Sequence, residues 1–262
     1  QPEEHWAVED AGLTAIGLAS LSGSLFERLL RNAAAKGWDD AHGMLITQGR
    51  MHRDVASFAN REYYGGLLRE AFERQSAPRG MFDPGSADAL ERALASARVV
   101  FFPSAAESAG RTSRGEALAA RRIVECVARV LGGGFTAQTI GVITPFRAQI
   151  GEIRRELAEI DSPLDLDALV TVDTVERFQG SQRDIIVVSF ALNHPGRIAQ
   201  AQSLSSDGAV DRKLNVTLTR AREHLVLLGC PEVLEKAPQY GKLLDFVRGL
   251  GGYHDGPPHH PR

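Results

Sequence analysis

The sequence has no phosphate-binding loop of the form G-x-x-x-x-G-K-[ST], because its only Gly-Lys pair, Gly241-Lys242, lacks the upstream glycine. No pair of acidic residues follows a predicted strand in a way that would hold Mg²⁺, and Asp173 after 170–172 comes nearest. On motifs alone, these absences argue against a nucleotide hydrolase that works by itself.

Cysteine is also scarce, and the two that occur, Cys126 and Cys230, stand alone in apolar surroundings. They offer neither a disulfide framework nor a metal-ligand spacing, so both are predicted to be buried thiols in a reducing compartment. Nothing resembles a signal peptide or an apolar run of membrane-spanning length. We therefore expect a cytoplasmic protein with no membrane partner and no metal ligands of its own.

Excess positive charge is missing as well, since the 262 residues carry a net charge of −3. With 43% hydrophobic and 24% charged residues, the composition is ordinary for a globular protein at the upper end of single-domain size. Because no basic field covers the whole chain, any nucleic-acid binding must come from a local groove.

We expect one α/β domain over residues 1–250, with a lead-in helix region over 1–44 and a long loop over 191–211. In the lead-in region a helix begins after Ser24, whose spacing to Glu27 is that of a capping box. Residues 251–262, rich in Pro, His and Gly, are predicted to be a disordered tail. The chain starts with Gln1 rather than methionine, which suggests a fragment or a processed product.

Short apolar runs of strand length alternate with helical stretches along the chain. Strands are predicted at 44–47, 99–102, 140–144, 169–172, 185–190 and 225–228, and helices at 58–64, 87–97, 116–131, 242–248 and from Pro145 onward. Apolar strands that alternate with helices of ten or more residues indicate a parallel sheet covered by helices on both faces.

The stretch Arg212–Arg222 carries the strongest local pattern. Read as a helix, it places apolar residues on one face (Leu214, Leu218, Ala221 and the following Leu225) and two cations and a hydroxyl on another (Lys213, Thr217 and Arg220). Taken alone, this pattern also fits an amphipathic surface helix with solvated basic residues.

Ligands of parallel α/β sheets bind beyond the carboxyl ends of the strands. We therefore expect the helix that bears Arg220 to converge with the polar residues at those ends, which are Gln48, Arg50, Thr144, Asp173 and Thr174. Arginines without a phosphate cradle suggest half of a shared site, in which this domain supplies positive charge to a transition state assembled on another domain.

Four blocks, in this order, resemble motifs of superfamily 1 helicases. They are Gln48–His52 (QGRMH), Ile140–Gln149 (IGVITPFRAQ), Val172–Asp184 (VDTVERFQGSQRD) and Arg212–Ala221 (RKLNVTLTRA). The chain resembles the second, C-terminal RecA-like domain in the branch of nonsense-mediated-decay and Okazaki-fragment helicases. The resemblance implies a three-layer α/β/α fold with a mostly parallel central sheet. The first domain, with Walker A and Walker B, is absent from this sequence.

The resemblance also implies roles for individual residues. Arg50 and Arg220 match the two arginines that act as fingers on the γ-phosphate of ATP, whose Mg²⁺ is held mainly by the missing domain. Nucleotide contacts are implied for Gln179, Gly180, Gln182 and Arg147, with Gly180 allowing close backbone approach. Sequence-independent contacts with nucleic acid are implied for Thr144, Pro145, Phe146, Thr174 and His52.

Structural roles stay open for several of these residues. His52 could equally be a hydrogen-bonding histidine of the fold, and Asp173 could be an N-cap. The phenylalanines Phe146 and Phe178 could be core residues rather than base-stacking platforms. Arg147 and Gln149 could be solvated on the first turns of a helix.

Three positions depart from the family pattern. Gly49 replaces the aromatic residue that stacks on adenine, Arg53 replaces a proline, and Gln182 replaces the glutamate expected to bind ribose. These changes leave the phosphate contacts in place and reduce base and sugar recognition, so we expect a relaxed nucleotide preference.

The sequence therefore predicts the second motor domain of an ATP-dependent superfamily 1 helicase that grips single-stranded nucleic acid. DNA is the expected polymer, and the N-terminal RecA-like domain of the same protein is the expected partner. Alone, the chain should hydrolyse almost no ATP. Two alternatives stay open: a non-catalytic nucleic-acid-binding or interaction module of the same fold, and an RNA-directed helicase.

Overall fold

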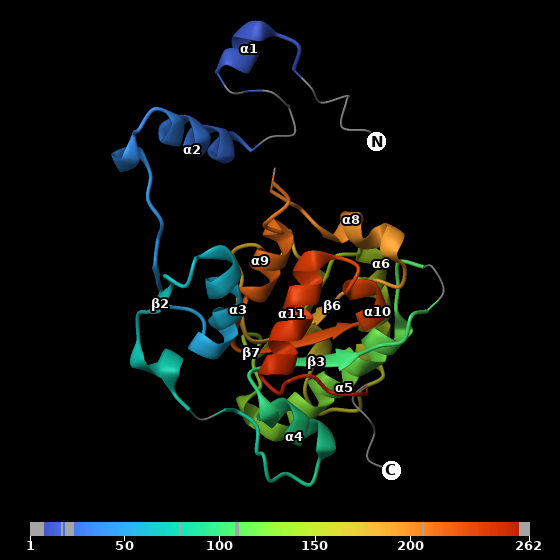
Figure 1. Cartoon of the computed structure of the whole chain (residues 1–262). Helices are drawn as coiled ribbons and strands as arrows, with labels where there is room; N and C mark the ends of the chain where they lie inside the picture. The colour runs from blue at the N-terminus through green and yellow to red at the C-terminus, as the bar shows by residue number, and fades with distance from the viewer. Residues whose placement is uncertain are drawn as a thin grey trace. The chain divides into compact units, whose positions relative to one another are not determined.

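A computed structural model describes residues 8–16, 18, 24–78, 80–107, 110–205 and 207–256. It separates the chain into two compact units, residues 1–46 and 47–262. The first unit contains α1 (Ala11–Ala15), α2 (Leu25–Ala35) and the 3-10 turn η2 (Asp39–Ala41) (Figure 1).

The first unit leaves much of its apolar surface uncovered. As predicted, Ser24 caps α2, because its Oγ accepts a hydrogen bond from the backbone N–H of Glu27 at 3.5 Å. On α2, however, Phe26 is 72% exposed. The strand predicted at 44–47 is wrong for its first three residues, since Leu45 is 88% exposed and pairs with no other strand.

The second unit is built on a five-stranded sheet in which every strand is parallel to its neighbours, in the order β3-β7-β6-β4-β5. The strands are β3 (Val99–Pro103), β4 (Ile140–Thr144), β5 (Thr171–Thr174), β6 (Arg183–Ser189) and β7 (Ala221–Gly229). A separate parallel pair is formed by β1 (Thr47–Gln48) and β2 (Arg69–Glu70). The predicted α/β class and the parallel sheet are thus confirmed.

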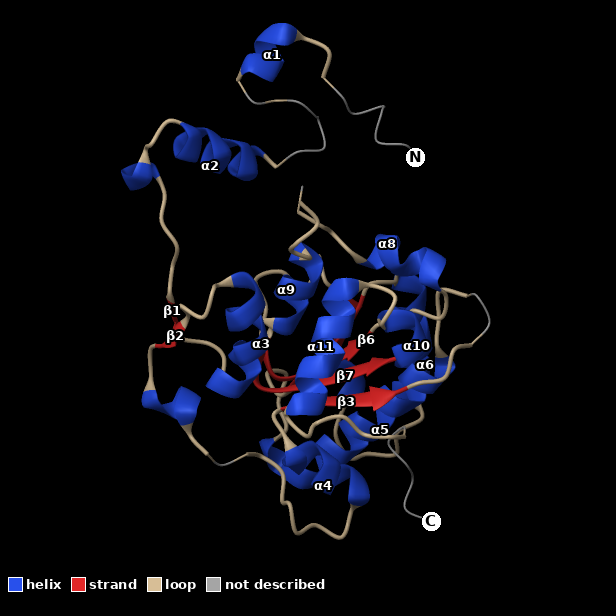
Figure 2. Ribbon diagram, in the orientation of Figure 1, coloured by secondary structure: helices blue, strands red, loops and turns tan. Residues whose placement is uncertain are grey.

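Helices cover both faces of this sheet. One layer holds α3 (Arg53–Tyr63), α8 (Ile198–Ala201), α9 (Arg212–Leu218), α10 (Pro231–Leu234) and α11 (Pro238–Gly249), and Figure 2 shows α11 in front of β3 and β7. The other holds α4 (Ala89–Ser96), α5 (Arg114–Leu131), α6 (Arg147–Ala158) and α7 (Leu166–Leu169). Three 3-10 turns complete the unit: η3 (Glu73–Ser76), η4 (Gly132–Gly134) and η5 (Pro195–Arg197).

The core follows from side-chain alternation along the strands. Phe101 packs into the cluster under α11, whereas its neighbour Phe102 packs into the cluster under α5. Both rings are buried. Apolar side chains on both faces explain why the strands appear in the sequence as continuous hydrophobic runs.

The connection from β5 to β6 is unusually short. These strands lie on opposite sides of β4, yet only residues 175–182 join them, fewer than the dozen or so that such a crossover usually takes. Phe178 crosses directly over β4 at Gly141, where a Cβ would stand 2.5 Å from its Cζ. We call residues 175–182 the crossover segment; the absence of a side chain at Gly141 is what lets it lie flat on the sheet.

The predicted C-terminal helix is shorter than its pattern implied. Leu214 and Leu218 lie buried on α9, but the helix ends at Leu218 and β7 begins at Ala221, so Leu225 is a strand residue. The reason is tertiary: from Ala221 onward the chain pairs with β6 on one side, and from Leu225 with β3 on the other. Arg220 consequently lies in the turn between α9 and β7, not on the helix.

The described part of the C-terminal segment follows β3. Phe101 N donates to Gly252 O at 2.9 Å, His254 N donates to Phe101 O at 3.0 Å, and the ring of Tyr253 stacks on that of Phe101. Residues 251–256 thus pack on the sheet instead of beginning a disordered tail, and residues 257–262 lie outside the described part. No helix among the described residues is long and apolar enough to cross a membrane.

Candidate functional site

Arg50 lies at the amino ends of β6 and β7. Its Nε donates to Gln182 Oε1 at 2.8 Å and its Nη1 donates to Thr219 O at 2.9 Å. Gln182 directly precedes β6, and Thr219 lies in the turn before β7. Two segments far apart in the sequence therefore meet through one guanidinium group.

The loop that carries Arg50 is fixed by the side chain of Gln48. Its Oε1 accepts hydrogen bonds from the backbone N–H groups of Arg50 and Met51 at 2.9 and 2.8 Å, and its Nε2 donates to Met51 O. The glutamine at the start of the first sequence block thus holds the backbone of the arginine two residues later.

Arg220 stands at the same end of the sheet. Its Nε donates to Val216 O at 2.9 Å and its Nη1 reaches Ser181 O at 3.5 Å. Burial, and to a smaller extent the nearby positive charge of Arg50, lower the pKa of Arg220. Two like charges held together without a counter-ion form a favourable site for an anion.

Within the described part of the chain, these two guanidinium groups donate hydrogen bonds to neutral oxygens. Neighbouring cations, by contrast, are neutralised by carboxylates: Arg222 pairs with Asp184 at 2.8 Å and Lys213 pairs with Glu176 at 2.9 Å. Among the described residues, no carboxylate lies within ion-pair distance of Arg50 or Arg220. Both are only half-buried, so an external anion can reach them.

The predicted nucleic-acid residues lie at the opposite, carboxyl end of the strands. Thr144 ends β4 and pairs with Thr174 at the end of β5. Both threonines are buried, and so is Phe146, which packs in the core. Pro145 is half-buried and Arg147 is exposed on the first turn of α6.

The expected convergence of all these residues is therefore wrong. The sheet is wholly parallel, so its amino and carboxyl ends are distinct. The amino end carries Arg50, Gln182 and Arg220, and the carboxyl end carries Thr144, Thr174 and Arg147. Arg147 was grouped with the nucleotide contacts, yet it lies with the threonines. The roles predicted for these residues stay predictions.

His52 is a structural residue in this conformation, being only 2% exposed. Its Nδ1 accepts from Asp54 N at 3.2 Å and caps α3, while its Nε2 lies 2.9 Å from Ala77 O. Its backbone N–H donates to Arg222 O at 2.7 Å. The side chain has no free edge with which to contact nucleic acid, so a direct contact would require the loop to move.

The crossover segment joins the two ends of the sheet. Gln179 and Gly180 are exposed on it, and Gly180 has φ +87° with no atom within 4 Å of the Cβ position. This left-handed conformation, and not a close contact within the chain, explains why residue 180 is a glycine. The open side leaves space for an approaching ligand.

Sequence reasoning missed a buried polar cluster at the carboxyl end. Gln149, for which a solvated position was one open alternative, is fully buried. Its Oε1 accepts from Ser113 N at 2.7 Å and its Nε2 donates to Ser113 O at 2.9 Å. Glu116 accepts from Ser189 Oγ at 2.7 Å and from the N–H of Ala191, a non-glycine residue with φ +48°. The capping-box spacing of Ser113 and Glu116 was the only sequence signal, and it does not reveal burial.

Glu116 is expected to make the stability pH-dependent. Burial raises its pKa from 4.5 to about 7, so the folded state keeps a proton that the unfolded chain releases. Its contribution to the free energy of unfolding therefore falls as pH rises from about 4.5 to about 7 and is level above that. Urea unfolding at pH 5, 6, 7 and 8 should show wild type losing stability relative to Glu116→Gln over this window. Parallel curves for the two proteins would contradict the assignment.

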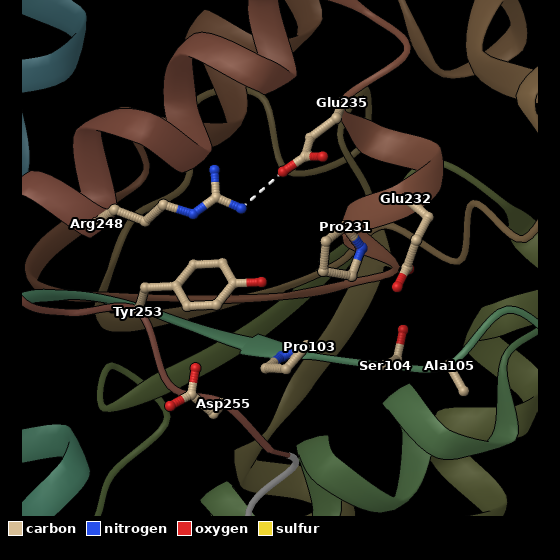
Figure 3. Close-up of a pocket in the computed structure, with 9 residues that line it drawn as sticks. All are labelled: Pro103, Ser104, Ala105, Pro231, Glu232, Glu235, Arg248, Tyr253 and Asp255. Atoms are coloured by element: carbon tan, nitrogen blue, oxygen red, sulfur yellow. Dashed lines mark hydrogen bonds and ion pairs between the residues drawn. The ribbon is translucent and has the colours of Figure 1, made fainter.

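A cavity of about 490 Å³ opens elsewhere, at the carboxyl end of β3 (Figure 3). Among the described residues that line it, the cation is Arg248, which is already paired with Glu235 and with Asp245, and these partners raise its pKa. Because its charges are satisfied within the chain, this cavity is a weaker anion site than the Arg50–Arg220 pair. The described residues contain no cluster of three or more His, Cys, Asp or Glu side chains that could hold a metal ion.

The sequence is similar to a protein family and to several known proteins. A family model described as an AAA domain matches residues 21–232. The "DNA replication ATP-dependent helicase/nuclease DNA2" of Mus musculus is 31% identical over 251 residues, covering 87% of this chain. The "Regulator of nonsense transcripts 1 homolog" of Arabidopsis thaliana is 30% identical over 237 residues (88% of this chain), and "RNA helicase Mov10l1" of Mus musculus 31% over 141 (54%). The chain spans only 22%, 17% and 12% of these proteins, respectively.

Proposed function

The chain belongs to the AAA domain family, as a C-terminal RecA-like domain of superfamily 1 helicases, and from this we propose that it is the second motor domain of an ATP-dependent helicase. ATP and its Mg²⁺ would be held mainly by a preceding RecA-like domain of the same protein. This chain would supply Arg50 and Arg220 to the γ-phosphate across the cleft between the domains.

The observation that carries this proposal is the pair of half-buried arginines for which no described residue provides a carboxylate partner. Negative charge develops on the transferred phosphoryl group, and positioned guanidinium groups stabilise it without giving up a proton. Arg50 and Arg220 are already held by neutral oxygens, so little reorganisation is needed when the phosphate arrives.

Coupling to nucleic acid would run through the crossover segment and α9. Both connect the two ends of the sheet, and they are tied to each other twice. Lys213 pairs with Glu176 at 2.9 Å near the carboxyl end, and Arg220 contacts Ser181 O near the amino end. A shift of Arg220 on phosphate release would therefore be passed to the end where Thr174 and Arg147 lie.

Single-stranded DNA is the polymer we propose, gripped through its phosphates and therefore without sequence preference. Since Thr144, Phe146 and His52 are buried, the exposed Arg147 and the backbone around Pro145 are the groups best placed for this contact. The similarity to a protein named as an RNA helicase keeps an RNA-directed motor as the second candidate.

The test is ATP hydrolysis by the full-length protein with oligo(dT) or oligo(U) of equal length. We expect oligo(dT) to stimulate hydrolysis more strongly, and residues 1–262 alone to show only background turnover. Stronger stimulation by oligo(U) would make it an RNA-directed motor. No stimulation by either polymer would favour the non-catalytic binding module.

A further inference from the structure

An aromatic ring occupies the space beside Gly49. Phe72, in the turn after β2, is 55% exposed, and a Cβ at Gly49 would lie 2.9 Å from its Cε2. Any side chain at position 49 would therefore have to displace the ring. Glycine at this position, next to Arg50, is what allows Phe72 to lie there.

The backbone of Phe72 is tied to the loop of Arg50 by the buried side chain of Gln75. Its Oε1 accepts from the backbone N–H groups of Ala71 and Phe72 at 3.1 and 3.0 Å, and its Nε2 donates to Gln48 O and Met51 O at 3.0 and 2.7 Å. Ala71 N also donates to Gln48 O at 2.9 Å. Phe72 is thus an exposed aromatic residue whose backbone is held in place.

A third arginine completes this surface. The Arg74 guanidinium lies 5.2 Å from the centre of the Phe72 ring and donates to Gly49 O at 2.9 Å. More than half of Phe72 stays exposed beside these contacts. An exposed ring on a hydrogen-bonded backbone, next to a loop that carries a phosphate-seeking arginine, provides the two elements that a nucleotide needs, an apolar plane for the base and a cation for the phosphates.

We propose that Phe72 is the platform on which the base of the nucleoside triphosphate stacks. The inference rests on the proposed function and adds to it the residue that contacts the base. A phenylalanine ring has no hydrogen-bonding group with which to tell one base from another, so it binds ATP and other nucleoside triphosphates alike. The ring lies where a side chain at position 49 would otherwise stand.

Phe72→Ala in the full-length protein tests this. We expect the KM for ATP to rise about 5- to 150-fold, the range that corresponds to the loss of one aromatic stack. The kcat should stay within about twofold, and inhibition by inorganic tripolyphosphate, which has no base, should be unchanged. Phe72→Trp should keep the wild-type KM. The matched control is Leu118→Ala, an exposed apolar residue on α5.

A position swap sharpens the test. Gly49→Tyr alone should disturb the site because its side chain meets the Phe72 ring, whereas Gly49→Tyr combined with Phe72→Ala should recover a low KM. The proposal is overturned if Phe72→Ala leaves the KM for ATP unchanged. It is equally overturned if the variant weakens tripolyphosphate and ATP alike, or if it weakens only oligo(dT) binding.

The proposed function fails in a different way. It fails if the wild-type protein shows no nucleic-acid-stimulated turnover, which is seen without any variant. In that event equilibrium titration with ATP still measures the platform: weaker ATP binding by Phe72→Ala, with tripolyphosphate binding unchanged, supports the stack, and equal ATP binding by both proteins overturns it.

Discussion

Replacing Arg50 or Arg220 by alanine in the full-length protein should lower ATP turnover by on the order of 10³-fold or more while ATP still binds. Each guanidinium group stabilises charge that develops only as the γ-phosphoryl group is transferred, so its loss raises the barrier without removing ground-state binding. Steady-state kcat and the equilibrium Kd for ATP, measured on the same variants, separate the two effects.

The fold should tolerate both changes. The acceptors left behind, such as Gln182 Oε1 and Ser181 O, belong to half-buried residues that water can reach. Arg53→Ala is the matched control, because Arg53 lies three residues beyond Arg50 with a largely exposed side chain that pairs with Asp54 at 3.6 Å. Arg50→Lys keeps the charge but loses the planar group, and should recover little turnover. Normal turnover in Arg50→Ala or Arg220→Ala would mean that the finger assignment is wrong.

Strands that are buried on both faces were predictable from the sequence. The run at 140–144 is β4 with the same bounds, because its neighbours β5 and β6 and both helix layers demand apolar residues throughout. The run at 44–47 was just as apolar, yet Leu45 is exposed, since the described residues of its unit offer no neighbouring strand. Hydrophobicity indicates what a segment could bury, but not whether a partner is present.

The site was less predictable because it depends on topology. Sequence order suggested that Arg220 and Thr174 would meet at the carboxyl ends of the strands. The crossover segment instead brings the chain back across β4, so Gln182 precedes β6 at the end where Arg50 lies. Nothing local in 175–182 signals this return. It becomes visible only when Phe178 is seen to lie on Gly141.

The contact between Phe178 and Gly141 should also be a major source of stability. Phe178 is 1% exposed and is the anchor of the crossover segment in the core. Phe178→Ala should lower the free energy of unfolding by about 3–5 kcal/mol, as expected for the removal of a buried aromatic ring. The measurement is urea unfolding, and an m value equal to that of the wild type would show that the change lies in stability and not in the surface exposed on unfolding. Leu118→Ala, at an exposed position, should change stability by about 0.5 kcal/mol or less.

Gly141→Ala tests the same contact from the strand. The new Cβ would lie 2.5 Å from Phe178 Cζ and 3.1 Å from Arg183 Cγ, so overpacking should lower stability by about 1–3 kcal/mol. In a Phe178→Leu background the ring is gone, and the same substitution should cost less, with an interaction energy of about 0.5–3 kcal/mol between the two sites. Strict additivity would show that the strand relaxes independently of the ring. A coupled result would show that the fit of Phe178 on Gly141 holds the segment that joins the arginine end of the sheet to the threonine end.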